Sequence, residues 1–433
     1  MLDFDFKRLK KAILNRPMLN QVLVLLLGTG SSRVLVFLFS PIISRLYFAE
    51  DFGVFAVFNS VVFIFSVVAA LRYELAIPIP KSEQDAFHVL LLAIISTISF
   101  AGLMFVVILF QSSWRQYVPN FDTIKPFIWL IPLGVIGTSI FQICSFWAIR
   151  KRDFQVIAKT TFGRSVISVL LQIVFGSLKV GPAGLIISDI VSRFGGFGSF
   201  FILFKSDLAL LKKVSFSEIL RIGREFRKFP MFSAWASLFN SVSLHLPDLF
   251  FPLYYGAKIG GLFVFANYVI GLSLGMLSQS VGQVFLGEAA ILLKKNSVDV
   301  RRLLLRTAKN LFLLFSIPII IFCIFSPTIF SVIFGPSWQV SGEYVRLLAV
   351  NYILQSAIVP ISSIINLSQH QVWQILWDAT RVLLISTVFY FCERYHLQPE
   401  VSIMLFSAAM SFMYVVLFIL SVGVTYQSGR SRL

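Results

Sequence analysis

Long apolar stretches run through this chain from one end to the other. A helix needs roughly 20 apolar residues to cross a bilayer, and stretches of that length recur between short polar junctions. Hydrophobic residues make up 57% of the sequence and charged residues 13%, whereas soluble domains carry about 25% charged residues. The sequence therefore predicts an all-α polytopic membrane protein. We expect twelve transmembrane helices, at about 20–46, 52–77, 86–110, 124–149, 154–178, 183–204, 229–254, 259–287, 303–325, 340–367, 372–391 and 400–426.

Lys and Arg gather at some junctions between these stretches and are nearly absent from others. Basic clusters occupy the N-terminus (Lys7 to Arg16), Arg150–Arg152, 205–228 and 294–309. Because cytoplasmic loops carry the excess of basic residues, both termini are expected in the cytoplasm, as an even number of spans also requires. The net charge of +17 then reflects topology and contact with anionic phospholipid, and no nucleic acid is expected as a partner. The charged N-terminus predicts a retained first span and no cleaved signal peptide.

An internal repeat divides the chain near its midpoint. Tyr47–Val61 and Tyr255–Val269 align without gaps, since 255 − 47 and 269 − 61 both equal 208. The two segments share a Tyr, an Ala, a Gly, a Phe, an Asn and the last Val, although chance identity in apolar segments is the alternative. A repeat of equal orientation predicts two pseudo-symmetric six-helix lobes facing a shared pathway. We place the N-terminal lobe at 1–205, a basic cytoplasmic linker at 206–228 and the C-terminal lobe at 229–433.

Positively charged residues lie on polar stripes of two spans in the N-terminal lobe. An Arg at mid-depth costs about 2.5 to 3.5 kcal/mol on insertion scales, so one that persists usually faces a wet cavity or a partner. In the first span Arg33 shares a helical face with Thr29, Ser40 and Ser44. In the fifth span Arg164 shares a face with Thr160, Ser168 and Gln172, next to Lys159. Arg33, Lys159, Arg164 and Gln172 are therefore candidate ligands of an anionic cargo, unless they only bridge helices.

The polar stripes of the C-terminal lobe are mostly neutral. They comprise Ser237, Ser241, His245 and Asp248 in the seventh span, Asn267, Gly271, Gly275, Gln279 and Gln283 in the eighth, and Asn351, Gln355, Ser362 and Asn366 in the tenth. Asn267 and Asn351 are candidates for hydrogen bonds to sugar hydroxyls. Asp248 is a candidate for ion coupling, with His245 on its face, although a packing role suits His245 too. Gly271-x-x-x-Gly275 also fits close helix packing.

Several charges inside the spans have an opposite charge at helical spacing. Asp189 with Arg193, Glu343 with Arg346 and Asp378 with Arg381 are expected to form structural ion pairs. Arg72 and Glu74 are two residues apart, so within one helix they point to different faces and are not expected to pair. The remaining charges are Arg33, Arg45, Lys159 and Arg164 against Asp248 and Glu288, with Arg45 alternatively reaching the outer interface. This positive surplus favours an anionic cargo such as a diphosphate, because Arg binds phosphate oxygens bidentately.

Motifs of catalysis and of cofactor binding are missing from the sequence. There is no GxxxxGK[ST] loop, no HExxH and no spaced Cys/His set, so we expect no enzyme, no catalytic residue, no metal and no cofactor. Asp3-Phe4-Asp5 stands alone, and Cys144, Cys323 and Cys392 form no CxxC pair. Aromatic residues at the span ends, among them Trp147, Trp338 and Trp377, are interpreted as interfacial anchors, with a platform for sugar stacking as the alternative.

Motifs in and between the first two spans and at the ninth junction resemble one known family. They are Gly30-Ser31-Ser32-Arg33 through Pro41, Ser44-Arg45-Leu46-Tyr47, Asp51-Phe52-Gly53-Val54-Phe55, Leu71-Arg72-Tyr73-Glu74-Leu75-Ala76-Ile77 and Phe334-Gly335-Pro336-Ser337-Trp338. In order and spacing the chain resembles the Wzx-type oligosaccharide flippases, in the MOP superfamily that includes multidrug and toxic-compound extrusion transporters. The resemblance implies translocation of an undecaprenyl-diphosphate-linked oligosaccharide across the bacterial inner membrane by alternating access.

The same resemblance implies a cation-lined lumen, with coupling to H⁺ or Na⁺ and contact with other polysaccharide assembly proteins. The cation-lined lumen is assigned to Arg33 and Arg164 because both lie on polar faces of their spans. By position only, the resemblance also makes Arg72 a candidate for substrate binding and Glu74 a candidate for ion coupling. The main competing function is that of a multidrug or cation extrusion antiporter of the same fold, whose cavity should be acidic. A membrane glycan polymerase or ligase and a scaffold without transport also remain open.

Overall fold

The computed structural model describes residues 17–205, 207–293, 297–367 and 371–430, and these residues form helices and connecting turns without strands. They fall into two compact units. The first contains the described part of Met1–Leu46 together with Val61–Tyr117 and Lys125–Leu238, and the second contains Tyr47–Ser60, Val118–Ile124 and the described part of Phe239–Leu433. The basic N-terminal run and Asp3-Phe4-Asp5 lie outside the described residues.

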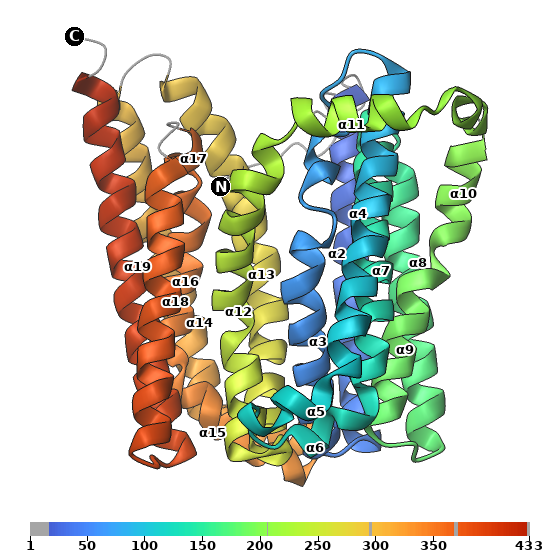
Figure 1. The fold of residues 1–433 in the computed structure, drawn as a ribbon. Coiled ribbons are helices and arrows are strands. Elements are labelled where there is room, and N and C mark those ends of the chain that lie inside the picture. Colours follow the sequence, from blue (N-terminus) through green and yellow to red (C-terminus); the bar gives the residue numbers. More distant parts are fainter. Residues whose placement is uncertain (1–16, 206, 294–296, 368–370, 431–433) are drawn as a thin grey trace. The chain divides into compact units, whose positions relative to one another are not determined.

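The helices follow one another with short connections (Figure 1). Up to the middle of the chain they are α2 (Pro17–Leu46), α3 (Ala49–Ala69), α4 (Glu83–Leu109), α5 (Gln111–Trp114), α6 (Phe121–Ile124), α7 (Ile131–Arg150), α8 (Phe154–Ser177), α9 (Pro182–Gly195), α10 (Phe197–Lys205) and α11 (Phe216–Glu225). Then come α12 (Ala234–Tyr255), α13 (Ala257–Leu293), α14 (Ser297–Phe334), α15 (Gln339–Leu347), α16 (Ala349–Ser362), α17 (Ile364–Leu367), α18 (Gln371–Arg394) and α19 (Pro399–Arg430).

Each of the twelve predicted spans falls on one helix or on consecutive helices. The sixth is divided into α9 and α10 at Gly196, and the tenth is bent by 59° between α15 and α16. Within the described residues, seven helices are long and apolar enough to cross a membrane, or eight if the bent pair counts as one span. The prediction of an all-α polytopic membrane protein is therefore confirmed.

Side chains at the helix ends account for several of these boundaries. Ser82 precedes α4 and its hydroxyl accepts a hydrogen bond from the Asp85 N–H at 3.3 Å. Asp153 precedes α8 and its carboxylate accepts from the Val156 N–H at 3.2 Å. Each satisfies one of the backbone donors that a helix start leaves unpaired.

In the first unit α2 runs along α8, α8 packs against α9, and α4 packs against α7 (Figure 1). The predicted linker 206–228 contributes α11, whose Ile219 and Ile222 are buried and which packs against α4. Trp147 of α7 is fully buried, and its indole N–H donates to Asp207 at 3.0 Å. Its interpretation as an interfacial anchor is wrong, because the Asp207 carboxylate satisfies the indole inside the protein.

Aromatic rings pack against one another in the core of the second unit. Phe250 and Phe389 stack with ring centres 4.0 Å apart, and Trp338 lies 4.1 Å from Phe265. Trp338 is 1% exposed and Trp377 5% exposed, so the anchor interpretation is wrong for both. The indole N–H of Trp377 donates to the Met413 carbonyl at 2.8 Å. This donor therefore has an acceptor inside the protein and does not depend on water at the membrane surface.

The two repeat segments contact each other reciprocally within the second unit. Ala49 and Ala257, the first residues of α3 and α13, occupy equivalent repeat positions, as do Gly53 and Gly261. A Cβ on Gly53 would overlap the Ala257 carbonyl, and a Cβ on Gly261 would overlap the Ala49 carbonyl. Each small-x-x-x-small motif thus packs against its counterpart, with backbones close enough to admit only glycine.

We predict that Gly53→Ala and Gly261→Ala each lower stability in detergent by about 1–3 kcal/mol, because overpacking forces the backbones apart. Gly102→Ala is the matched control, since a Cβ there meets nothing within 4 Å and Ala favours a helix by about 1 kcal/mol over Gly. Thermal unfolding followed by size-exclusion chromatography measures the effect. Wild-type melting of both repeat variants would contradict the reciprocal contact.

Candidate functional site

A buried ion pair lies on α9 in the first unit. The Arg193 Nε donates to Asp189 Oδ2 at 2.6 Å, and its Nη1 donates to the Thr138 hydroxyl of α7. The guanidinium also lies over the Phe63 ring, 5.1 Å from its centre. Arg193 is 2% exposed, so the predicted structural pair with Asp189 is confirmed.

Arg164 of α8 adds a second guanidinium to this region. It is half-buried and lies over the Phe141 ring, 4.2 Å from its centre, where the face of the aromatic ring attracts a cation. The charges of Arg193 and Asp189 both act on it. Two guanidinium groups therefore interact with one carboxylate, and this part of the first unit carries a net positive charge.

Other polar residues of the predicted α8 stripe bond locally. The Gln172 side-chain amide donates to the Ser168 hydroxyl at 3.2 Å, and the Thr160 hydroxyl donates to the Gly196 carbonyl at 3.5 Å. A Cβ at Gly196 would contact the Thr160 side chain, so the break between α9 and α10 makes room for α8. The stripe is thus partly used to hold the first unit together.

Arg33 and Lys159 lie on the helix pair α2 and α8. Gly28 of α2 lies against Ala158 of α8, where a Cβ on Gly28 would overlap the Ala158 side chain. Lys159 follows this close approach directly, and both Arg33 and Lys159 are exposed. In contrast to Arg193, their charges are accessible from outside the unit.

Arg72 and Glu74 form an ion pair, so the expectation that they do not pair is wrong. Arg72 Nη1 lies 3.1 Å from Glu74 Oε1, and the Glu74 side chain is 1% exposed. Leu71 and Arg72 both have positive φ, 50° and 61°, which ends the helix at the α3–α4 junction and brings the two side chains together. The predicted span 52–77 therefore ends early, with α3 at Ala69.

The junction that holds this pair is tied to its surroundings by backbone carbonyls. The Tyr73 hydroxyl donates to the Gly223 carbonyl of α11 at 3.3 Å, and Arg150 Nη1 donates to the Pro80 carbonyl at 2.7 Å. Burial raises the pKa of the Glu74 carboxyl above its ordinary value, and the charge and hydrogen bond of Arg72 only partly counteract this.

In the second unit Arg381 of α18 is held by several acceptors. Its Nη2 donates to Asp378 and to the Asn240 side chain, each at 3.0 Å, and to the Ser243 hydroxyl. The guanidinium lies 4.4 Å from the centre of the Trp377 ring. The predicted pair of Asp378 with Arg381 is confirmed, and it connects α18 to α12.

The predicted pair of Glu343 with Arg346 is wrong. In the described part of the chain, the Arg346 guanidinium donates to the backbone carbonyls of Cys323 and Ile324, at 2.9 and 2.6 Å. Both acceptors belong to α14, which contains Pro327. Since Pro carries no N–H, the carbonyl of Cys323, four residues earlier, lacks its helical donor, and Arg346 supplies one.

His245 and Asp248 lie close together on α12. His245 Nδ1 is 3.8 Å from Asp248 Oδ2, and both side chains are about one quarter exposed, 27% and 26%. Pro252 in the same helix leaves the Asp248 backbone carbonyl without its i+4 donor. The carboxylate, this carbonyl and the imidazole thus offer polar atoms at one level of α12.

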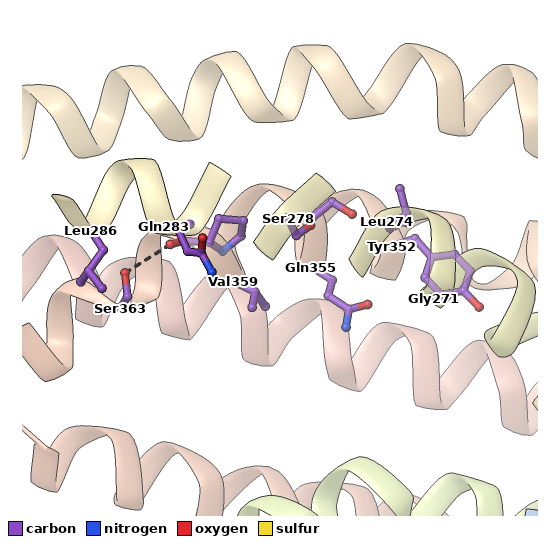
Figure 2. A pocket seen from close by; sticks show the side chains of 12 residues that line it. Gly271, Leu274, Ser278, Gln283, Leu286, Tyr352, Gln355, Val359 and Ser363 are labelled. Carbon is purple, nitrogen blue, oxygen red and sulfur yellow. Dashed lines mark hydrogen bonds between the residues drawn. The ribbon is translucent and has the colours of Figure 1, made fainter. Parts of the chain in front are cut away.

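A cavity of about 480 Å³ lies between α13 and α16 of the second unit (Figure 2). Three residues of the predicted stripes line it: Gly271, Gln283 and Gln355. The side chains of Gly275, Gln279 and Asn366 lie outside the described residues. A Cβ on Gly271 meets nothing within 4 Å, so close helix packing does not explain this glycine.

The two candidate asparagines lie beside this cavity and do not line it. Asn267 accepts a hydrogen bond from the Tyr352 hydroxyl at 2.6 Å, and Tyr352 is a wall of the cavity. Asn351 is buried, and its Oδ1 has no hydrogen-bond partner among the described residues. On this side the cavity is lined by Tyr352, Gln355, Ser356, Val359 and Pro360 of α16 and by Ser363, which follows the helix. Tyr352, Ser356, Val359 and Ser363 recur at spacings of four, three and four residues, a helical pattern that the predicted stripe through Asn351 does not include.

The described residues contain no group of three or more His, Cys, Asp or Glu side chains able to hold a metal ion.

Comparison with solved structures identifies the fold. The chain is similar to the lipid II flippase MurJ in an inward closed conformation, with 14% identity over 93% of this chain and 87% of that chain and a TM-score of 0.69. It is similar to an inward-facing multidrug resistance MATE family transporter of the MOP superfamily, with 15% identity over 95% and 96% of the chains and a TM-score of 0.61. A MOP superfamily transporter from Pyrococcus furiosus gives 14% identity over 95% of both chains and a TM-score of 0.54. The chain therefore has the fold of a MOP superfamily transporter.

Residues 42–343 match the family described as polysaccharide biosynthesis protein. Because the match covers more than half of the sequence, the chain belongs to this family, and the resemblance inferred from its motifs is confirmed. A search of curated proteins finds no match.

We predict that Arg72→Ala lowers the stability of the purified protein by about 3 kcal/mol at neutral pH, because it leaves a buried carboxylate without its counter-charge. The Arg72→Ala/Glu74→Gln double variant removes both charges and should recover most of the loss. The defect of Arg72→Ala should also shrink as the pH falls through the raised pKa of Glu74, since the protonated carboxyl carries no charge.

Melting temperatures at pH 7.5 and pH 5 provide the measurement, and Arg115→Ala, at an exposed position, is the control. A double variant as unstable as Arg72→Ala would contradict the pair.

Proposed function

We propose that this protein is a flippase that moves an undecaprenyl-diphosphate-linked oligosaccharide repeat unit across the bacterial inner membrane by alternating access. The observation that carries the proposal is the net positive group formed by Arg164, Arg193 and Asp189 inside an apolar helical unit. Guanidinium groups in such surroundings favour a phosphate-bearing ligand. Membership of the polysaccharide biosynthesis family directs the choice to a lipid-linked glycan.

In this proposal Arg164 and the two exposed cations Arg33 and Lys159 attract the diphosphate. Asp189 holds Arg193 in place. Arg193 therefore adds to the positive electrostatic potential near Arg164 and does not bind the diphosphate directly. Arg72 is a substrate candidate by position, but its guanidinium pairs with Glu74 at the α3–α4 junction, and we assign it to the structure of that junction. The protein carries out transport and no covalent chemistry.

The proposal includes a cytoplasmic position for both termini, which the basic junctions support. Arg150, Lys151 and the exposed basic residues of α11 then face the inner leaflet, where anionic phospholipid attracts them. Lys151 bonds Glu83 at 2.9 Å and Asp207 at 3.1 Å. Burial alone would lower the pKa of the Lys151 ammonium, but these two carboxylates raise it above its ordinary value, so its charge persists at physiological pH.

We predict that Arg164→Ala reduces surface polysaccharide at least about tenfold at equal protein level, because one charge-assisted contact to phosphate is worth about 1.5–3 kcal/mol. Arg33→Ala should act in the same direction. Arg164→Lys should retain intermediate activity, since Lys keeps the charge and loses the bidentate geometry. Arg115→Ala is the control. The readout is surface glycan in cells that depend on this gene, and full activity of both Ala variants would reject the phosphate role.

Ion coupling is assigned to Asp248 with His245, whose polar atoms lie 3.8 Å apart. Glu74 is a further coupling candidate by position, but its burial beside Arg72 suits a fixed pair better. We predict that Asp248→Asn removes the dependence of transport on an imposed H⁺ or Na⁺ gradient in proteoliposomes, while Asp122→Asn, at an exposed position, leaves it unchanged. Gradient-dependent transport by Asp248→Asn would reject this assignment.

Direct assays separate the flippase from two competing functions. The MATE-like fold also suits an extrusion antiporter, and gradient-driven efflux of a cationic dye by the purified protein would favour it. New glycosidic product from a lipid-linked donor would favour a membrane polymerase or ligase.

A further inference from the structure

The cavity between α13 and α16 differs chemically from the cationic region of the first unit. None of the described residues that line it carries a charge, and its polar groups are hydroxyls and the two amides of Gln283 and Gln355 (Figure 2). Its volume of about 480 Å³ lies within the range of about 300–1,000 Å³ usual for small-molecule sites. Leu274, Leu286 and Val359 supply apolar wall. The site thus combines apolar faces with neutral hydrogen-bonding groups.

Hydrogen bonds hold two polar side chains of the cavity wall in place, one to a residue outside the wall and one to a residue within it. The Tyr352 hydroxyl donates to Asn267 at 2.6 Å, so its ring has a fixed position at one end. At the other end Ser363 donates to the Pro360 carbonyl at 3.3 Å. Because Pro360 carries no N–H, the carbonyl of Ser356 lacks its helical donor in the wall of the cavity.

Glycine creates part of the space. Gly271 of α13 lines the cavity, and a Cβ placed there would meet nothing within 4 Å. A larger side chain at Gly271 would therefore enter the cavity without displacing the helix. Gly287 of the same helix also has open space around a Cβ, but it does not line the cavity.

We propose that this cavity binds an uncharged pyranose of the glycan, with Gln283 and Gln355 hydrogen-bonding its hydroxyl or acetamido groups. A pyranose has apolar C–H faces and a polar rim, which match the apolar and amide parts of the wall. This inference rests on the proposed function for the identity of the glycan carrier. It adds that the two units divide recognition, the first unit binding the diphosphate and the second a neutral sugar.

The uncharged wall of the cavity also disfavours charged sugars. A uronic acid or an amino sugar would bring an ion into a cavity without a counter-charge among its described lining residues, and an ion that is desolvated without a partner is strongly disfavoured. The protein should therefore discriminate against a charged sugar at this position of the repeat unit.

Equilibrium binding to the full chain in nanodiscs tests the proposal, with chitobiose and cellobiose as neutral probes and digalacturonic acid as the charged probe. Gly271→Leu fills the cavity, Gln283→Leu/Gln355→Leu removes the amides, and Gly287→Leu is the matched control. We expect one or both neutral disaccharides to bind the wild type and Gly287→Leu. They should bind the double variant at least about tenfold more weakly, the cost of two lost hydrogen bonds, and Gly271→Leu at least as weakly, because its side chain occupies the space of the ligand. Digalacturonic acid should bind the wild type at least about tenfold more weakly than the better neutral probe, because its charge is desolvated without a partner.

The inference is overturned if neither neutral disaccharide binds the wild type, if digalacturonic acid binds as well, or if Gly271→Leu and the double variant bind like the wild type. Arg164→Ala should bind the neutral probes normally and yet lose surface polysaccharide, which separates the sugar site from the diphosphate site. If sugar binding follows the expected pattern while Arg33→Ala and Arg164→Ala transport normally, the phosphate role fails and the sugar site stands.

Discussion

The cost of placing a guanidinium group in apolar surroundings governs the interior of both units. Arg193 and Arg381 are 2% and 3% exposed. Each donates hydrogen bonds to a carboxylate three or four residues earlier and to a hydroxyl of another helix. These contacts join α9 to α7 and α18 to α12. Arg193 and Arg381 are thus committed to the structure, and the proposed diphosphate role falls to the less enclosed charges of Arg164, Arg33 and Lys159.

The two units carry different polar chemistry. The first holds charged groups around α8 and α9, whereas the cavity of the second is lined by amides, hydroxyls and apolar side chains. A lipid-linked glycan has the same two parts, an anionic diphosphate and a hydroxyl-rich saccharide. Recognition by separate sites would let the diphosphate contacts remain constant while changes at Gln283 or Gln355 alter the sugar that is accepted.

Hydropathy and helical spacing predicted the helices and two of the three ion pairs, because burial in lipid selects apolar stretches and intrahelical pairs are local. What the sequence did not reveal depends on tertiary contacts or on unusual backbone. Leu71 and Arg72 take a left-handed conformation that is uncommon for residues other than Gly, so the Arg72–Glu74 pair was missed. Trp147 looks like an interfacial residue until Asp207, 60 positions away, satisfies its indole. The cavity face that begins at Tyr352 was missed because it lies next to the predicted stripe that begins at Asn351, and both have helical spacing.

The reciprocal contact of Ala49–Gly53 with Ala257–Gly261 has a consequence for biogenesis. The first segment leaves the ribosome 208 residues before its counterpart, since 257 − 49 = 208. During that interval Gly53 at the start of α3 lacks its packing partner, the backbone at Ala257. The second unit can therefore be completed only after α13 is inserted. A chain that stops before that helix would leave the small-residue surface of α3 unpacked, where membrane quality-control proteases could act on it.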